Sequence, residues 1–257
     1  MIYRKSFLPI TLFSSALFLE LVVAPSLFAK VQAESQTANQ AQIIQDSSIA
    51  RVTFDPPGTG KPDDTAGGAS RGGGCPQEVV TKGGCVIPVM PNTAEGLTVA
   101  EHPTFFVYIP ETSAKEIFFS LVDENQVTQY QTKIPITNKG GVMAFKLPDS
   151  APPLVVGKNY QWTFIVIGDL GLRPDSPGVQ GGIKRIEPAS TLIGELQNKN
   201  LVERAALYAK NGIWYDTITS LASASKAQSS TANITPIWQD LLTSVGLQEI
   251  ANKPLLN

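Results

Sequence analysis

Between residues 85 and 187, short runs of apolar and aromatic residues alternate with polar positions and stop at proline, glycine or asparagine. This period of two is typical of β-strands that bury one face, and it puts Tyr160, Trp162 and Phe164 on the same face. Glu124-Asn125-Gln126 predicts a hairpin turn. The predicted strands are 51–54, 85–89, 104–109, 116–123, 127–136, 141–148, 159–168 and 179–188. Because no strand–helix–strand pattern occurs, we predict an antiparallel, Ig-like β-sandwich of about seven or eight strands.

Beyond Pro188 the apolar residues recur every three or four positions, which predicts α-helices. Asn211-Gly212 is a predicted stop between two helices, and Gly246 ends another before a last short helix at 247–251. The stretch LYAKNGIWYDTITSLA (207–222) is similar to a tetratricopeptide hairpin, but one such unit cannot bury its own face. We therefore favour a helical hairpin docked on the sandwich over a peptide-binding array. The predicted fold class is α+β.

The first 33 residues have the pattern of a secretory signal peptide. Arg4 and Lys5 precede an apolar stretch, and Val31-Gln32-Ala33 fits the rule for cleavage after Ala33. An uncleaved membrane anchor is the alternative, but Glu20 interrupts the stretch, and a charge inside a membrane span is costly. We expect no transmembrane span after cleavage. The expected location is the periplasm or cell envelope, or the extracellular space.

Two low-complexity stretches precede the predicted sheet. Residues 34–50 are dominated by Gln, Ser, Asn and Ala, which predicts a disordered lead-in. Residues 55–74 are rich in Pro and Gly and predict an extended arm. FDPPGTGKP (54–62) looks like a phosphate-binding loop, but Asp55 stands at the first glycine position and Pro62 at the Ser/Thr position. The predicted organisation is a signal peptide (1–33), a lead-in (34–50), a β-sandwich (51–187) with its Pro/Gly-rich arm (55–74), and a helical module (188–257).

The net charge and the cysteine content bear on three properties: nucleic-acid binding, a disulfide and a metal site. The formal net charge is −2, which does not favour nucleic acid as a partner. In an exported chain, Cys75 and Cys85 are predicted to form a local disulfide, with two free thiols as the alternative. Two cysteines and a single histidine do not make a convincing zinc site, and we expect no metal and no cofactor.

No pattern predicts a catalytic residue. His102 is the only histidine, and no Gly-x-Ser-x-Gly elbow accompanies it, so we interpret it as a turn residue. Paired carboxylates hydrolyse glycans when they face each other across a cleft. The candidate carboxylates all lie in predicted turns or loops, where solvated side chains are the default: Asp63, Asp64, Asp123, Glu124 and Asp169.

Aromatic residues are the one enrichment that suggests binding. Phe105-Phe106 and Phe118-Phe119 each place one ring on either face of a sheet. The outward rings are either covered by the helical module, which we favour, or form a binding patch. The candidate binding aromatics are Phe106, Phe119, Trp214 and Tyr215.

Several long motifs resemble one family, the exported cyanobacterial family called domain of unknown function 928. They are FDPPGTGKPDDTAGGASRGGGC (54–75), HPTFFVYIP (102–110), PPLVVGKNYQWTF (152–164), RPDSPGVQGGIKRI (173–186), LYAKNGIWYDTITSLA (207–222) and WQDLLTSVGLQEIANKPL (238–255). The resemblance covers about residues 51–256 and implies no assigned activity, so it transfers no site residues.

The chain departs from this family at three places. Family members tend to carry Trp where Gly182 stands. They often have Cys after the Trp-x-Phe strand, where this chain has Gly168-Asp169, and tend to lack a match to Cys85. The resemblance thus implies that a Cys75–Cys85 pair replaces a cross-sheet bond here.

Together, these patterns predict an exported, non-enzymatic protein that binds or scaffolds other molecules of the cell envelope, either an envelope protein or a glycan. The alternative is a hydrolase that acts on envelope glycan or peptide.

Overall fold

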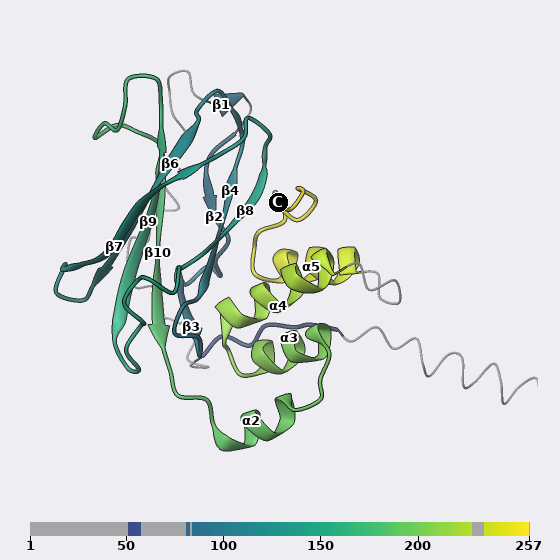
Figure 1. Ribbon diagram of the computed structural model, residues 1–257. Helices are drawn as coiled ribbons and strands as arrows, with labels where there is room; N and C mark the ends of the chain where they lie inside the picture. The colour runs from purple at the N-terminus through teal and green to yellow at the C-terminus, as the bar shows by residue number, and fades with distance from the viewer. Residues whose placement is uncertain (1–50, 58–80, 83, 228–233, 257) are drawn as a thin grey trace, which may run out of the picture. The chain divides into compact units, whose positions relative to one another are not determined.

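The computed structural model describes residues 51–57, 81–82, 84–227 and 234–256 (Figure 1). The predicted signal peptide, the lead-in and most of the Pro/Gly-rich arm lie outside these residues. Ile49–Asn257 form one compact unit, in which mostly antiparallel sheets combine with α-helices. The predicted α+β class is therefore confirmed.

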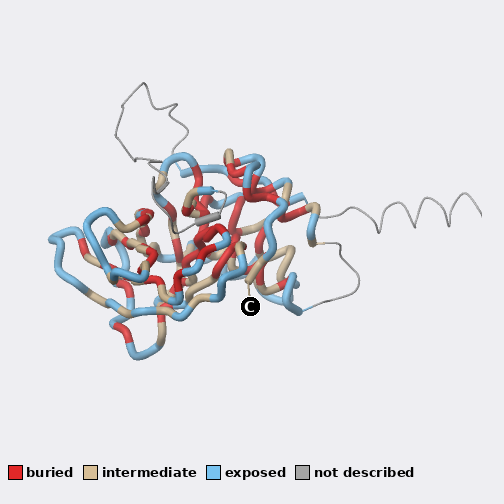
Figure 2. The backbone as a smooth tube through the Cα atoms, turned by 90° about the horizontal axis from the view of Figure 1, so that it is seen from above, coloured by how far each residue is buried: buried red, intermediate tan, exposed pale blue. Residues whose placement is uncertain are grey.

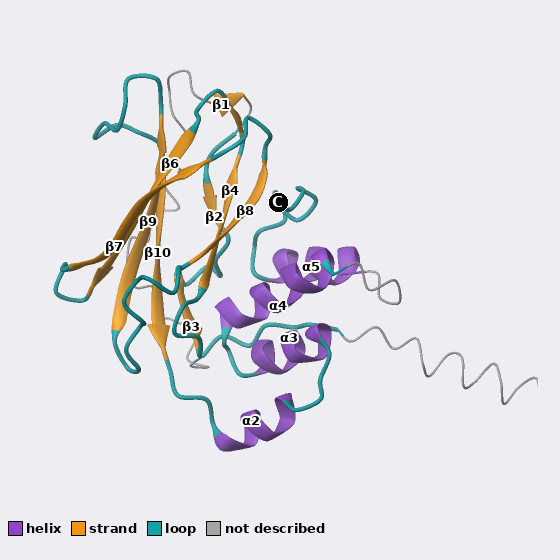
Figure 3. Cartoon of the chain, in the orientation of Figure 1, coloured by secondary structure: helices purple, strands orange, loops and turns teal. Residues whose placement is uncertain are grey.

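Within the described residues the strands form three sheets (Figure 3). The largest has the order β3-β10-β9-β6-β7, the second β2-β4-β8, and β1 pairs with β5. Every pairing is antiparallel except that of β3 with β10. The strands are β1 (Thr81–Lys82), β2 (Ile87–Pro88), β3 (Glu95–Thr98), β4 (Thr104–Ile109), β5 (Glu111–Thr112), β6 (Glu116–Asp123), β7 (Thr128–Pro135), β8 (Gly141–Lys146), β9 (Asn159–Ile167) and β10 (Gly178–Arg185).

The six long strands, β4 and β6 to β10, agree with the sequence prediction to within a few residues. The prediction of a strand at 51–54 is wrong. Val52 and Phe54 are buried, but the backbone N–H of Asp55 donates to the carbonyl of Ala209 in a helix, 3.1 Å away. This segment therefore packs on the helices instead of joining a sheet. Of the strand predicted at 85–89, only Ile87–Pro88 form a strand, which is β2.

The two larger sheets face each other through aromatic rings. Phe105 and Phe145 are register partners on β4 and β8. Their rings lie 5.1 and 4.6 Å, respectively, from that of Phe119 on β6, and Phe119 lies 4.9 Å from Phe164 on β9. Such tilted aromatic contacts add to the free energy gained from burying apolar area. This layer is the core that the alternation in the sequence predicts.

The described helices are α2 (Ser190–Leu196), α3 (Leu201–Lys210), α4 (Trp214–Lys226) and α5 (Ile234–Ser244). Helix α4 packs on β4 from the side opposite the larger sheet, α3 and α5 pack on α4, and α2 packs on α3 (Figure 1). As a result, β4 is buried on both faces, and in Figure 2 the buried residues gather in the centre, where strands and helices meet. The C-terminal residues close the edge of β8, because Val142 exchanges backbone hydrogen bonds of 2.8 Å with Pro254 and Leu256.

The helix boundaries follow local signals. Asn200 and Glu203 form a capping box at the start of α3. Gly212 ends α3 with a φ of 69°, as the predicted Asn211-Gly212 stop requires. The prediction of a last short helix at 247–251 is wrong, since those residues form turns. Within the described part of the chain, no helix is long and apolar enough to span a membrane.

Candidate functional site

A cavity of about 620 Å³ lies where four parts of the chain meet. They are the 85–95 segment, the turn between β6 and β7, the adjoining parts of β9 and β10, and the turn that follows α5. Its volume lies within the usual range for small-molecule sites, about 300–1,000 Å³. The cavity is therefore the candidate binding site.

The charged side chains in the described lining are all acidic. Of the described residues that line the cavity, all the charged ones are carboxylates, and five more carry side-chain amides. The carboxylates are Glu95, Asp123, Glu124 and Glu249, and the amides are Asn92, Gln126, Asn159, Gln161 and Gln180. Apolar residues complete the wall, among them Ile87, Pro88, Met90 and Leu247. The site thus combines hydrogen-bonding groups with an apolar surface and lacks a basic side chain among these residues.

Asp123 builds the wall and is already occupied by local hydrogen bonds. It lies at the end of β6, and its carboxylate accepts from the backbone N–H groups of Asn125 and Val127, both at 2.9 Å. The side-chain amide of Gln129 donates to the same carboxylate at 3.1 Å. These bonds hold the predicted turn, in which Gln126 adopts a φ of 61°. Asp123 therefore acts as a turn residue.

Two glycines of β10 shape the opposite wall. A Cβ on Gly181 would collide with the ring of Trp162, so only glycine fits there. A Cβ on Gly182 would lie 3.1 Å from Cγ of Glu95. The backbone carbonyl of Gly182 accepts a hydrogen bond of 2.8 Å from the hydroxyl of Tyr215. The indole N–H of Trp162 donates to that hydroxyl at 2.6 Å. Tyr215, on α4, thus fixes this wall from behind.

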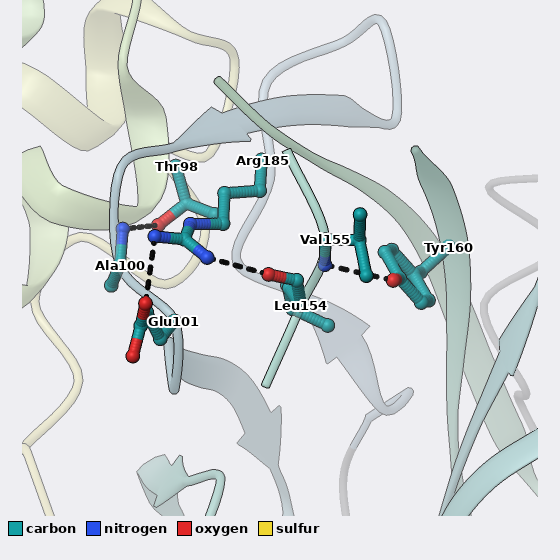
Figure 4. A network of polar contacts seen from close by, with 7 residues as sticks. All are labelled: Thr98, Ala100, Glu101, Leu154, Val155, Tyr160 and Arg185. Carbon is teal, nitrogen blue, oxygen red and sulfur yellow. Dashed lines mark hydrogen bonds and ion pairs between the residues drawn. The ribbon is translucent and has the colours of Figure 1, made fainter. Parts of the chain in front are cut away.

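A polar network fixes Tyr160, another lining residue (Figure 4). The backbone N–H of Val155 donates to the hydroxyl of Tyr160 at 3.0 Å. The neighbouring carbonyl of Leu154 accepts from Nη1 of Arg185 at 2.7 Å, and Nη2 donates to Glu101 at 3.0 Å. Arg185 lies on β10 and ties the 154–155 segment to the sheet. Its role is structural, since it is not among the lining residues.

The four aromatic residues proposed as a binding patch are all buried, which corrects that prediction. Phe106, Phe119, Trp214 and Tyr215 are 3%, 0%, 0% and 2% exposed. Helix α4 packs on β4, which carries Phe106, whereas Phe119 lies between the two sheets against Phe105 and Phe145. The outward ring of that pair, Phe118, is only partly buried, so the expected cover by the helical module does not extend to β6. The indole N–H of Trp214 donates to the carbonyl of Val89 at 2.9 Å, and its ring packs edge-on against Phe54.

The other sequence candidates do not form a catalytic arrangement. Nε2 of His102 lies 3.0 Å from the carbonyl oxygen of Ala151, and His102 is not a lining residue. Asp63, Asp64 and Cys75 lie outside the described residues, so the Cys75–Cys85 disulfide stays a prediction. The described residues contain no group of three or more His, Cys, Asp or Glu side chains that could hold a metal ion.

Sequence reasoning missed most of the polar lining. Gln161 and Gln180 alternate with the buried residues Trp162 and Gly181 and therefore belong to the opposite face of the sheet. The available signal was Gln161, a side-chain amide on the aromatic-rich strand β9. The parallel register that brings Glu95 beside Gly182 had no signal in the sequence.

Comparison with known families matches residues 66–255 to the family described as Domain of Unknown Function (DUF928). A search of the curated proteins found no match.

Proposed function

The chain belongs to the family described as Domain of Unknown Function (DUF928), and we propose that it is an exported, non-enzymatic binding module of the cell envelope. The observation that carries this proposal is the cavity of about 620 Å³, with its carboxylate and amide lining. Its walls are held in place by buried contacts such as that of Tyr215 with Trp162. A preorganised wall of this kind reduces the entropy lost on binding.

The role of Asp123 favours binding over catalysis. General acid–base hydrolysis needs two carboxyl groups that are free to exchange protons across the bound substrate. Asp123 instead accepts three hydrogen bonds from its own turn and the neighbouring strand.

A hydrolase of envelope glycan or peptide is the second candidate function, because Glu95, Glu124 and Glu249 line the same cavity. Release of product from such polymers by the wild type, and its loss in Glu95→Gln or Glu124→Gln, would favour this alternative.

Export and the origin of the chain belong to the same proposal. Arg4, Lys5, the apolar stretch and Val31-Gln32-Ala33 support a signal peptide, and the family resemblance supports a cyanobacterial envelope protein. N-terminal sequencing of the protein from its host should find Glu34 first. A retained Met1 would refute cleavage.

We also propose that the facing sheets form an immunoglobulin-like sandwich and that Cys75 pairs with Cys85. The contacts of Phe119 with Phe105 and Phe145 support the sandwich. A ten-residue step between the cysteines, in an exported chain, supports the disulfide. Mass spectrometry of the unreduced protein after proteolysis tests it.

Photo-crosslinking tests the binding function without knowledge of the ligand. A photoreactive phenylalanine analogue replaces either Gln180, which lines the cavity, or Gln131, which does not. Gln180 and Gln131 lie in one row across the sheet, paired through Thr163 and Ser120, so they are matched in exposure to the same face. Irradiation in the producing cells should give an envelope adduct from position 180 alone. Equal adducts from both positions, or none, would contradict the proposal.

A further inference from the structure

We infer, on the basis of the proposed function, that the cavity takes a neutral, hydroxyl-rich ligand: a saccharide of one or two rings. Three properties of the lining lead to this ligand class. They are its charge, its balance of hydrogen-bond donors and acceptors, and its apolar part.

The lining disfavours anionic ligands. Four carboxylates lie around the cavity, and its described lining has no lysine, arginine or histidine. A phosphate, sulfate or uronate group would therefore find no cationic partner among these residues, and the screened carboxylates would add a weak repulsion. Neutral and cationic ligands remain.

The donor and acceptor balance favours hydroxyls over amines. An ammonium group only donates hydrogen bonds, whereas a hydroxyl both donates and accepts. Five side-chain amides line the cavity, and each offers two N–H donors that an ammonium group cannot accept from. Adjacent hydroxyls on a sugar ring can bind the carbonyl and the NH₂ of one amide, such as Gln161 or Gln180.

The carboxylates attract a cation less than their number suggests. Asp123 already accepts three hydrogen bonds, two from N–H groups of the turn and one from Gln129. Glu95, Glu124 and Glu249 are exposed, so water and salt screen their attraction for a positive charge. They remain good acceptors for hydroxyl protons, which is the role that a sugar site requires.

The apolar residues of the wall suit the C–H face of a sugar ring. Ile87 and Pro88 of β2 are partly exposed, and Leu247 follows α5. A purely apolar ligand would instead leave the amides and carboxylates without partners, which is costly. A volume of about 620 Å³ admits one or two rings and not a long polymer buried along its length.

Gly182 offers a variant that closes the cavity. The Cβ added there points at Glu95 and Ala94, both lining residues, so an indole at this position occupies the cavity. The φ of Gly182 is not positive, so the backbone accepts a side chain.

Gly182→Trp is the blocking variant. Gln161→Ala with Gln180→Ala is the second variant, which removes two amides and leaves the backbone unchanged. Gln131→Ala, outside the lining, is the control.

Saturation-transfer NMR on the mature chain tests the ligand class. The probes are cellobiose, maltose and N,N′-diacetylchitobiose as neutral disaccharides, glucuronate as an anion and spermidine as a cation. We expect saturable binding of at least one neutral disaccharide and none of glucuronate. The double alanine variant should weaken that binding about ten-fold or more, which corresponds to about 1.4 kcal/mol, because it removes the hydrogen bonds of two amides. Gly182→Trp should abolish it, and Gln131→Ala should leave it within about two-fold.

The outcomes separate the ligand class from the binding function. Binding of spermidine alone, sensitive to Gly182→Trp, would overturn the saccharide and keep the cavity as the site. Sugar binding that persists unchanged in both variants would place the site elsewhere and overturn the inference. The absence of binding of any neutral disaccharide would also overturn the saccharide inference. The proposed binding function is tested separately, by the crosslinking experiment, and is contradicted if position 180 gives no specific adduct.

Discussion

Single residues in this protein connect distant parts of the chain. Gly212 shows this most directly: it lies at the turn between α3 and α4, and Asp55 and Pro57 pack against it. The first family motif and the helical-hairpin motif are thus in contact. Residues 54–57 (FDPP), which precede the glycines of the phosphate-loop look-alike, form a segment that packs on a helix turn.

Gly212→Ala tests this close approach. The new Cβ would lie 2.9 Å from both the carbonyl oxygen of Asp55 and Cδ of Pro57, at a φ of 69° that disfavours alanine. We expect the free energy of unfolding to fall by about 1–3 kcal/mol in urea denaturation. Gly194→Ala is the control. Its Cβ meets no atom within 4 Å in α2, and it should raise stability by up to about 1 kcal/mol. Equal effects of the two substitutions would contradict the role of Gly212.

Two tryptophans allow a matched comparison of indole hydrogen bonds. Nε1 of Trp214 donates to the carbonyl of Val89, whereas the buried Nε1 of Trp238 finds no acceptor among the described residues. Trp214→Phe should therefore cost about 1–2 kcal/mol more than Trp238→Phe, because it also leaves a buried carbonyl unpaired. Thermal unfolding of both variants measures the difference, and a larger loss in Trp238→Phe would refute it.

Asp216 makes stability depend on pH. Its carboxylate accepts from the hydroxyl of Thr98 at 2.8 Å and from the N–H of Val99 at 3.1 Å. Burial raises the pKa of Asp216, and the bonds from Thr98 and Val99 and the charge of Arg204 only partly oppose that rise.

Because the pKa is higher in the folded than in the unfolded state, the folded state binds more protons between the two values. The contribution of Asp216 to stability is therefore greatest below its unfolded pKa, about 3.9, and falls as pH rises through the folded pKa. Asp216→Asn keeps an oxygen acceptor and cannot ionise. Urea unfolding between pH 3 and 8 should show the wild type losing stability relative to Asp216→Asn as pH rises. Parallel profiles would contradict this.

At the scale of elements, α4 is the part that joins the layers. Its first turn carries three residues that hydrogen-bond to other elements. Trp214 bonds to the segment before β3, and Asp216 bonds to β3 itself. Tyr215 bonds to both β9 and β10. The first turn of this helix thus contacts both larger sheets and the back of the cavity wall.

Tyr215→Phe tests that connection. It removes one hydroxyl and leaves the indole N–H of Trp162 and the carbonyl of Gly182 without that partner. We expect a loss of about 1–3 kcal/mol in the free energy of unfolding, because the indole N–H of Trp162 is buried and the carbonyl of Gly182 is partly buried. Amide hydrogen exchange at β10 should also accelerate. A loss below about 0.5 kcal/mol would mean that the hydroxyl does not hold this wall.

The same elements show what the sequence can predict. Strand β6 matches the predicted 116–123 because Ile117, Phe119 and Leu121 alternate strictly with less buried residues. Residues 51–54 have an equally strand-like composition, but their burial comes from α3 and α4, which are more than 140 residues away in sequence. β3 was missed because EGLT is short and contains glycine. The cavity depends on register and long-range contact between such segments, so local patterns could not reveal it.

At the scale of the molecule, the helical module, the two larger sheets and the C-terminal residues form one packed unit. The aromatic residues, which the sequence offered as a surface for binding, make up its interior. Binding is assigned instead to a polar cavity at the edge of the sheet. Its lining comes from strands, turns and a loop that only the complete fold brings together.

Amide chemical shifts test the binding function most directly. The ¹⁵N-labelled mature chain is titrated with soluble glycans released from the envelope. We predict saturable shifts at amides that line the cavity, above all Glu95, Gln161 and Gly182, and their absence in Gly182→Trp. Shifts confined to the groove between residues 51–55 and α3, which is lined by Arg51, Lys199 and Lys210, would place binding elsewhere and contradict the account.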